Sequence, residues 1–157
     1  MSVFVIDASV VVKWFVPEIY SDAARRLLEL PHEYVAPDLL FAETANTIWK
    51  KIRREELTAK EGQQLLADIG QIAVATVSCR ALAEDAHALA CATGRTVYDS
   101  MYVALAVRLN TRAITADERL ESALKRITAV AGHIQLVQTF ERDVKDVQAG
   151  NDPQSPE

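Results

Sequence analysis

The chain alternates between short continuous apolar runs and longer stretches in which apolar residues recur every three or four positions. Residues 3–6 are all apolar and end at Asp7, which is typical of a strand buried on both faces of a parallel sheet. Similar runs predict strands at residues 33–36, where Pro37 follows, and at 72–77, 112–116 and 134–137. Helical spacing predicts helices at residues 21–30, 38–54, 80–93, 99–109 and 118–126, and a capping box at Thr58 and Glu61 opens another.

Strands that alternate with helices imply right-handed crossovers, and hence a mainly parallel central sheet with helices on both faces. The predicted fold class is therefore α/β, a three-layer α/β/α sandwich. The length of 157 residues fits one domain, which we place at residues 1–142. Residues 143–157, with Gly150, Asn151, Pro153 and Pro156, are predicted to form a polar tail without fixed structure.

The composition narrows the class of protein. Half of the residues are hydrophobic and a quarter are charged, and the apolar runs are too short to cross a bilayer, so no membrane segment is expected. The N-terminus has no basic leader, from which we expect a cytoplasmic location. Cys79 and Cys91 form no C-x-x-C motif and the three histidines are scattered, so we expect packed cysteines and no zinc site. A formal net charge of −5 argues against a broad nucleic-acid-binding surface.

Two acidic residues follow predicted strands directly. Asp7 comes after residues 3–6, and Asp117 comes after the strand at 112–116. Ligands of open α/β sheets bind beyond the carboxyl ends of the strands, where both acids are expected to lie. Each also has a purely structural interpretation, since Asp7 could begin a turn and Asp117 could cap the next helix.

Asp99 and Glu43 belong to predicted helices. Asp99 opens a helix that is apolar on nearly every face, so its carboxylate is expected to be half-buried. The helix dipole stabilises such a carboxylate by about 1 kcal/mol or less, whereas desolvating an ion costs several kcal/mol. A bound cation would offset the difference. Glu43 lies on the polar stripe of its helix, which a solvated face also explains, and Asn46 one turn further on could orient it. The apolar stripe opposite is predicted to be Phe41, Ala45, Ile48 and Ile52.

Convergence of these four acids would call for a metal ion. Two carboxylates about 4 Å apart at an effective dielectric near 20 repel by roughly 4 kcal/mol, which a hard divalent cation relieves. Oxygen-only ligands suit Mg²⁺ or Mn²⁺. Such an ion can activate a water molecule, polarise a phosphate and neutralise a leaving oxygen, so the chemistry expected is metal-dependent hydrolysis of a phosphodiester.

Four segments together resemble PIN-domain ribonucleases, most closely the VapC-type toxins of toxin–antitoxin pairs. They are residues 6–9, Glu43 with Asn46, residues 98–106 and residues 115–117, and the resemblance extends over residues 3–137. It implies an α/β/α sandwich, an acidic pocket with one or two Mg²⁺ or Mn²⁺ ions, and endonucleolytic cleavage of RNA that leaves 5′-phosphate and 3′-hydroxyl ends. It also implies homodimers and a cognate antitoxin that blocks the pocket.

The resemblance assigns positions as well as a fold. The acidic positions of the family fall on Asp7, Glu43, Asp99 and Asp117. Its hydroxyl positions beside the metal fall on Ser9 and Thr115, for which turn and cap roles are the alternative.

Basic residues that could contact RNA are few. The densest cluster is Lys50, Lys51, Arg53 and Arg54, and Lys13 lies close to the first acid. Basic residues at the end of a helix also complement its dipole, and Glu55 with Glu56 partly cancels this cluster. Trp14 could stack on a base, or could form core or dimer surface with Phe15 and Val16.

Other α/β proteins carry acids at strand ends. A response-regulator receiver needs a lysine just after a late strand, and Lys125 lies instead in a predicted helix. A phosphatase of the haloacid dehalogenase type needs a second acid where Ser9 stands. A non-catalytic PIN-like RNA-binding module should have lost acids that are present here. A PIN-fold nuclease that processes RNA or cuts flap DNA stays open, although the short chain favours the toxin interpretation.

Overall fold

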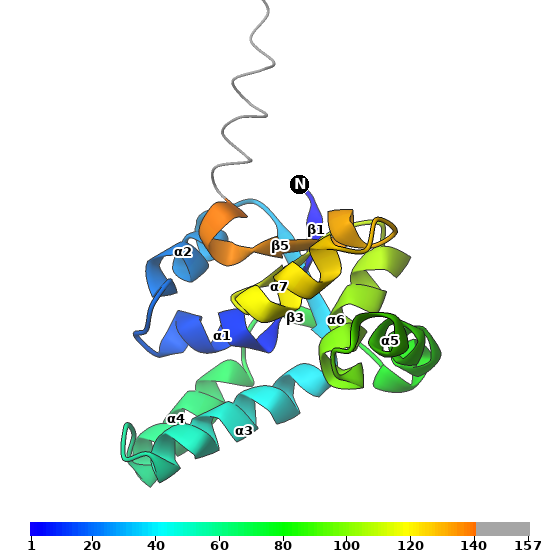
Figure 1. Cartoon of the computed structure of the whole chain (residues 1–157). Helices are drawn as coiled ribbons and strands as arrows, with labels where there is room; N and C mark the ends of the chain where they lie inside the picture. Colours follow the sequence, from blue (N-terminus) through cyan, green and yellow to red (C-terminus); the bar gives the residue numbers. More distant parts are fainter. Residues whose placement is uncertain (141–157) are drawn as a thin grey trace, which may run out of the picture.

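The computed structural model describes residues 1–140, which contain one parallel sheet of five strands in the order β3-β2-β1-β4-β5 (Figure 1). The strands are β1 (Val3–Ile6), β2 (Glu33–Pro37), β3 (Val74–Val77), β4 (Ala113–Thr115) and β5 (Ile134–Leu136). Every neighbouring pair is parallel, which confirms the predicted sheet and the α/β class. The predicted tail at residues 143–157 lies outside the described residues.

Helices connect the strands and pack in two groups. They are α1 (Ala8–Phe15), α2 (Ser21–Arg26), α3 (Leu39–Arg53), α4 (Ala59–Ile69), α5 (Cys79–Thr93), α6 (Val97–Arg108) and α7 (Glu118–Lys125), with short 3₁₀ turns at Leu27–Glu29, Ala131–His133 and Val137–Thr139. Apolar side chains of α1, α3 and α4 share one cluster, and those of α6 and α7 share another with β5. Figure 1 shows α3 beside α4 and α5 beside α6. Because crossovers are right-handed, the connections on the two sides of β1 place these groups on opposite faces of the sheet.

The central strand β1 fixes the position of Asp7. Phe4, Val5 and Ile6 are buried in the main core, and Ile6 is in register with Ile114 of β4. The ladder continues one residue further, where the Asp7 amide donates to the Ile114 carbonyl oxygen over 3.0 Å. The first acid and the end of β4 therefore meet at the carboxyl edge of the sheet.

Helix α1 was not among the predicted elements. Its apolar residues continue those of the preceding strand, and its polar stripe consists of only Ser9 and Lys13, four positions apart, which is too short a pattern to stand out in the sequence. Trp14 is core, with its indole N–H donating to the Ala24 carbonyl oxygen over 2.8 Å, which confirms the core alternative. The early turn into a helix is what places Ser9 and Lys13 beside Asp7.

Several boundaries differ from those predicted. The helix at 21–30 changes to a 3₁₀ turn after Arg26, the strand at 72–77 begins at Val74, and α6 begins at Val97. Ile48 and Ile52 of the predicted α3 stripe pack against the core, which confirms those two members. Leu40 and Thr44 are buried with them, whereas the predicted member Phe41 is 37% exposed.

Of the predictions for the helix cap and the cysteines, one is confirmed and one is partly wrong. The capping box of α4 is confirmed, since the Glu61 amide donates to Thr58 Oγ1 and the Thr58 amide donates to Glu61 Oε2. The prediction that both cysteines pack is wrong for Cys91, which is exposed. Within residues 1–140, no helix is long and apolar enough to cross a membrane.

Candidate active site

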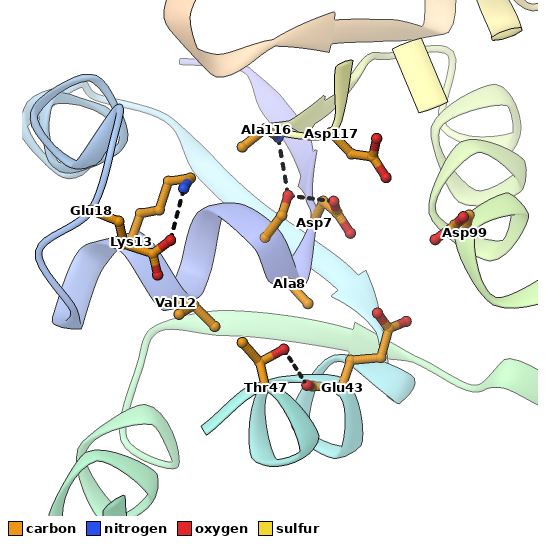
Figure 2. Close-up of a pocket in the computed structure, with 11 residues that line it drawn as sticks. Asp7, Ala8, Val12, Lys13, Glu18, Glu43, Thr47, Asp99, Ala116 and Asp117 are labelled. Atoms are coloured by element: carbon orange, nitrogen blue, oxygen red, sulfur yellow. Dashed lines mark hydrogen bonds and ion pairs between the residues drawn. The ribbon is translucent and has the colours of Figure 1, made fainter. Parts of the chain in front are cut away.

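The four predicted acids, Asp7, Glu43, Asp99 and Asp117, here called the acidic quartet, line one cavity of about 300 Å³. They come from the end of β1, from α3, from the first turn of α6 and from the residue that precedes α7. Figure 2 shows their carboxylates directed toward a common space. The structure therefore brings together four residues of which the first and last, Asp7 and Asp117, are 110 positions apart in the chain.

Asp7 is the most buried member of the quartet, with 7% of its surface exposed. Its Oδ2 accepts hydrogen bonds from Ser9 Oγ over 2.6 Å and from Thr115 Oγ1 over 2.7 Å. Although Asp7 precedes α1, its side chain caps no backbone amide of that helix. Burial raises the pKa of the Asp7 carboxyl above its usual value, the two hydroxyl groups lower it, and the charges of Asp99 and Asp117 raise it again.

Ser9 and Thr115 connect the two strand ends. The Ala116 amide donates to Ser9 Oγ over 3.0 Å, and the Asp117 amide donates to Thr115 Oγ1 over 3.1 Å. Each hydroxyl thus accepts from the β4–α7 loop and donates to Asp7. The pair fixes the orientation of the Asp7 carboxylate relative to Asp117.

Asp117 both caps a helix and contributes a carboxylate oxygen to the pocket. Its Oδ1 accepts from the amides of Arg119 and Leu120 and caps α7, whereas its Oδ2 lies 3.7 Å from Arg95 Nη2. Thr115 and Glu118 have the spacing of a capping box, but the Thr115 hydroxyl is bonded to Asp7 instead. Because the cap uses only Oδ1, Oδ2 is available to the pocket.

Asp99 is the third residue of α6, whose cap is Thr96: the Asp99 amide donates to Thr96 Oγ1 over 3.1 Å. The Asp99 side chain is 27% exposed, which agrees with a half-buried acid. Burial raises the pKa of the Asp99 carboxyl, Arg95 counteracts this, and Asp117 adds to it.

Glu43 has no stabilising partner for one of its oxygens. Its Oε1 is buried and, like the buried Tyr102 hydroxyl, makes no hydrogen bond of ordinary geometry within residues 1–140, although that hydroxyl is near enough to lower the Glu43 pKa. Burial, followed by the negative charges of Asp7 and Asp99, raises the pKa of Glu43 to about 7. A solvated face therefore does not explain this residue, because a glutamate on such a face keeps its ordinary pKa.

Asn46 does not reach the cavity. It is exposed, and Thr47 is the residue of α3 that lines the pocket after Glu43. The Thr47 hydroxyl donates to the Glu43 carbonyl oxygen over 3.0 Å, within the helix.

Among the predicted RNA contacts, Lys13 lies at the site. It lines the cavity, is 7% exposed and donates to Glu18 Oε2 over 3.1 Å. Lys51 Nζ lies 3.2 Å from Glu18 Oε1 and 3.1 Å from Glu56 Oε2. Lys50, Arg53 and Arg54 are exposed and do not line the cavity, and the Arg53 guanidinium lies 5.0 Å from the ring centre of Trp49.

Two residues of the site were missed from the sequence. Glu18 lines the cavity and joins Lys13 to Lys51, and Arg95 lies within 3.7 Å of two quartet carboxylates. Arg95 stands four positions before Asp99, the spacing of an ion pair along a helix, which was a usable signal. Nothing in the local sequence around Glu18 indicates its contacts.

The carboxylates as they stand are bonded to protein groups. Asp7 is held by hydroxyl groups and Asp117 by helix amides, and Asp99 and Asp117 both face Arg95. Correspondingly, residues 1–140 contain no group of three or more His, Cys, Asp or Glu side chains already arranged to hold a metal ion.

Fold and site together define an α/β protein whose parallel sheet ends on a pocket of four carboxylates. A model of the PIN domain matches residues 4–125, and the chain belongs to the PIN domain family. Ribonuclease VapC3 of Pyrobaculum aerophilum is 36% identical over 118 residues, which are 74% of this chain and 90% of that protein. The family predicted from the four sequence segments is thereby confirmed.

Solved structures share the fold. PAE2754 of Pyrobaculum aerophilum superposes with a TM-score of 0.64 at 19% identity, over 91% of this chain and 89% of that one. VapC20 of Mycobacterium tuberculosis, a toxin that cleaves the sarcin–ricin loop, superposes with a TM-score of 0.60 at 17% identity, over 76% of this chain and 94% of that one. VapBC2 of Rickettsia felis, solved bound to promoter DNA, gives a TM-score of 0.57 at 15% identity, over 85% and 98%.

Proposed function

We propose that this protein is a divalent-metal-dependent endoribonuclease that acts as the toxin of a toxin–antitoxin pair. The observation that carries the proposal is the convergence of the acidic quartet on one cavity, in a chain 36% identical to a ribonuclease of the VapC type. The alternative of a non-catalytic scaffold is disfavoured, because such a protein has no need to keep four buried or half-buried acids together.

The donor set of the pocket fits Mg²⁺ or Mn²⁺. Asp7, Glu43, Asp99 and Asp117 offer carboxylate oxygens, and Glu43 Oε1 is buried with no partner in the described chain. Buried like charges of this kind are costly unless a cation compensates them. These four residues would hold the ion, which when bound supplies an activated water molecule and a positive charge for the phosphate.

The surrounding residues orient the acids. Ser9 and Thr115 each donate to Asp7 Oδ2, so one oxygen of that carboxylate is fixed and Oδ1 is left for the ion. Helix amides hold Asp117 Oδ1 in the same way. Such fixed second partners keep a metal-binding carboxylate in one orientation and sharpen its geometry.

Lys13 is the basic residue best placed to bind a phosphate of the RNA. It lines the same cavity as the quartet, and its ion pair with Glu18 directs its ammonium group. With a net charge of −5, the protein must obtain its affinity for RNA from such local contacts and from the metal. The proposed substrate implies a cytoplasmic place of action.

The toxin role implies a cognate antitoxin that covers the pocket, and a homodimer as the active form. Support for an antitoxin comes from the relatives, among them a VapBC complex of Rickettsia felis.

Cleavage of RNA by the purified chain tests the catalytic part. Labelled single-stranded RNA should be cut with Mg²⁺ or Mn²⁺, should survive in EDTA, and should be cut again when Mn²⁺ is restored in excess. Asp99→Asn should reduce the rate by roughly 100-fold or more, since removing one electrostatic group from an active site costs on that scale. Asp85→Asn, at an exposed acid of α5, is the matched control and should cleave normally. Cleavage that persists in EDTA or in Asp99→Asn would overturn the metal mechanism.

The biological role needs a separate test. Controlled expression in bacteria should stop growth with the wild-type chain and not with Asp99→Asn, and co-expression of the cognate antitoxin should restore growth. Growth unaffected by an enzyme that is active in vitro would favour RNA processing over the toxin role. DNA of the same sequence, included in the cleavage assay, decides whether the substrate is RNA alone.

A further inference from the structure

Arg95 is a positive charge that the chain itself places among the acidic quartet. It follows Gly94, which ends α5 with a φ of +71°, and it precedes α6. Its Nη2 lies 3.5 Å from Asp99 Oδ2 and 3.7 Å from Asp117 Oδ2. One guanidinium therefore serves two quartet members from two different elements.

The contact differs from an ordinary exposed pair along a helix. An exposed i,i+4 pair between Arg95 and Asp99 alone would contribute little to stability. Here the side chain is 28% exposed, its Nε is buried with no partner in residues 1–140, and the second carboxylate comes from beyond β4. The guanidinium thus lies beside two quartet carboxylates rather than spread over the surface.

The other two acids lack any such cation. In the described part of the chain, neither Asp7 nor Glu43 forms an ion pair; Asp7 is bonded to hydroxyl groups, and Glu43 Oε1 has no partner. Lys13 lines the cavity but is bonded to Glu18. The positive charge that the protein supplies is therefore confined to the Asp99 and Asp117 side of the quartet.

We propose that Arg95 is a built-in cation of the pocket that takes the place of one divalent ion beside Asp99 and Asp117, so that each chain binds a single Mg²⁺ or Mn²⁺. The proposal rests on the metal-dependent function proposed above and specifies its stoichiometry. Four ionised carboxylates carry four negative charges, of which Arg95 and one divalent ion offset three. A second ion would leave the pocket positive, and it would also have to displace the guanidinium or lie against it.

Counting bound Mn²⁺ tests this. The full chain, freed of metal, is titrated with Mn²⁺ at constant pH, and bound ions are measured by calorimetry and by the electron paramagnetic resonance signal of free Mn²⁺. The wild-type chain should bind one ion, and Arg95→Gln should bind two. Arg95→Lys keeps the charge and should bind one. Arg108→Gln, which loses an arginine paired with Asp85 on the surface, should also bind one.

The outcomes separate this proposal from the function on which it rests. Two ions in the wild-type chain, or equal stoichiometry in the wild type and Arg95→Gln, would overturn the role of Arg95 and leave the nuclease intact. No Mn²⁺ binding by the wild type, with no metal-dependent cleavage, would instead remove the proposed function. Circular dichroism establishes that each variant is folded. A second readout is thermal stability without metal, which Arg95→Gln should lower and saturating Mn²⁺ should restore.

Discussion

The Thr115 hydroxyl donates to Asp7 Oδ2 across 2.7 Å, although the two residues are 108 positions apart in the chain. The bond joins the ends of β1 and β4, whose register places Ile6 beside Ile114. Since Asp7 is almost fully buried, its carboxylate depends on this hydroxyl and on that of Ser9 for hydrogen bonds. The sheet register thus determines how the first acid of the pocket is held.

Thr115→Val should therefore destabilise the protein and impair the site together. The change keeps the shape and removes one donor to a buried carboxylate, which costs about 1–3 kcal/mol in the free energy of unfolding. Loss of this donor also raises the pKa of Asp7 further. The pH below which cleavage is lost should therefore move upward. Urea unfolding and a pH profile of cleavage measure the two effects. Thr139→Val, which removes a hydroxyl bonded to the Leu136 carbonyl oxygen away from the pocket, is the control; equal effects of both variants would contradict the prediction.

The metal-free protein should lose stability as pH rises through the range set by Glu43. The pKa of this group is about 7 in the folded chain against 4.5 ordinarily, so between these values the folded state holds a proton that the unfolded state has lost. The contribution of protonated Glu43 to the free energy of unfolding is then fully present below about pH 4.5 and decreases as pH rises toward about pH 7. Unfolding in urea with EDTA, repeated with Mn²⁺, should show a decline that the metal reverses.

Glu43→Gln isolates that contribution. The neutral side chain should raise metal-free stability at about pH 8 by on the order of 1 kcal/mol, a figure reduced because Glu43 is partly solvated. Cleavage should fall at the same time, since a ligand is lost. The decrease of metal-free stability with rising pH should become smaller but should not vanish, because the pKa values of Asp7 and Asp99 are also raised. Glu84→Gln, at an exposed position of α5, should change neither quantity; a gain in stability there would show that overall charge, not the pocket, is responsible.

Lys13→Met should weaken substrate binding more than catalysis. Methionine keeps most of the buried stem and removes the ammonium group, and Glu18 retains Lys51 as a partner. The loss of one phosphate contact is worth roughly 1 kcal/mol, so KM for RNA should rise about fivefold with kcat little changed. Steady-state kinetics at fixed salt measure this, with Lys60→Met on the exposed start of α4 as the control. A fall in kcat at unchanged KM would assign Lys13 to the chemical step instead.

Two helix caps with the same chemistry should differ in their effect on activity. Thr96 caps α6 by accepting from the Asp99 amide, and Thr58 caps α4 by accepting from the Glu61 amide. Replacing either with alanine should cost about 1 kcal/mol of stability. Thr96→Ala should also reduce cleavage, because the first turn of α6 carries Asp99, whereas Thr58→Ala should leave it unchanged. Equal activities in the two variants would mean that the cap does not position Asp99.

The sequence by itself determined the parallel α/β class and most elements, because these depend on local patterns. Local patterns also singled out Asp7, Asp99 and Asp117, whereas Glu43 was indicated mainly by the resemblance to PIN domains. A buried strand is a continuous apolar run, a cap is a Thr with a Glu three residues on, and acids at strand ends fall at one sheet edge. It did not reveal α1, whose polar stripe consists of only Ser9 and Lys13, nor the exposure of Phe41 on α3.

Only the tertiary structure decided how the acids are held. The bond from Thr115 to Asp7, the unpartnered oxygen of Glu43 and the contact of Arg95 with Asp117 each join segments distant in the chain. Their energies depend on burial and on distances of 2.7 to 3.7 Å, which no local pattern encodes. Residue types indicated that a cation belongs in the pocket; the fold determined that the chain supplies part of that charge itself.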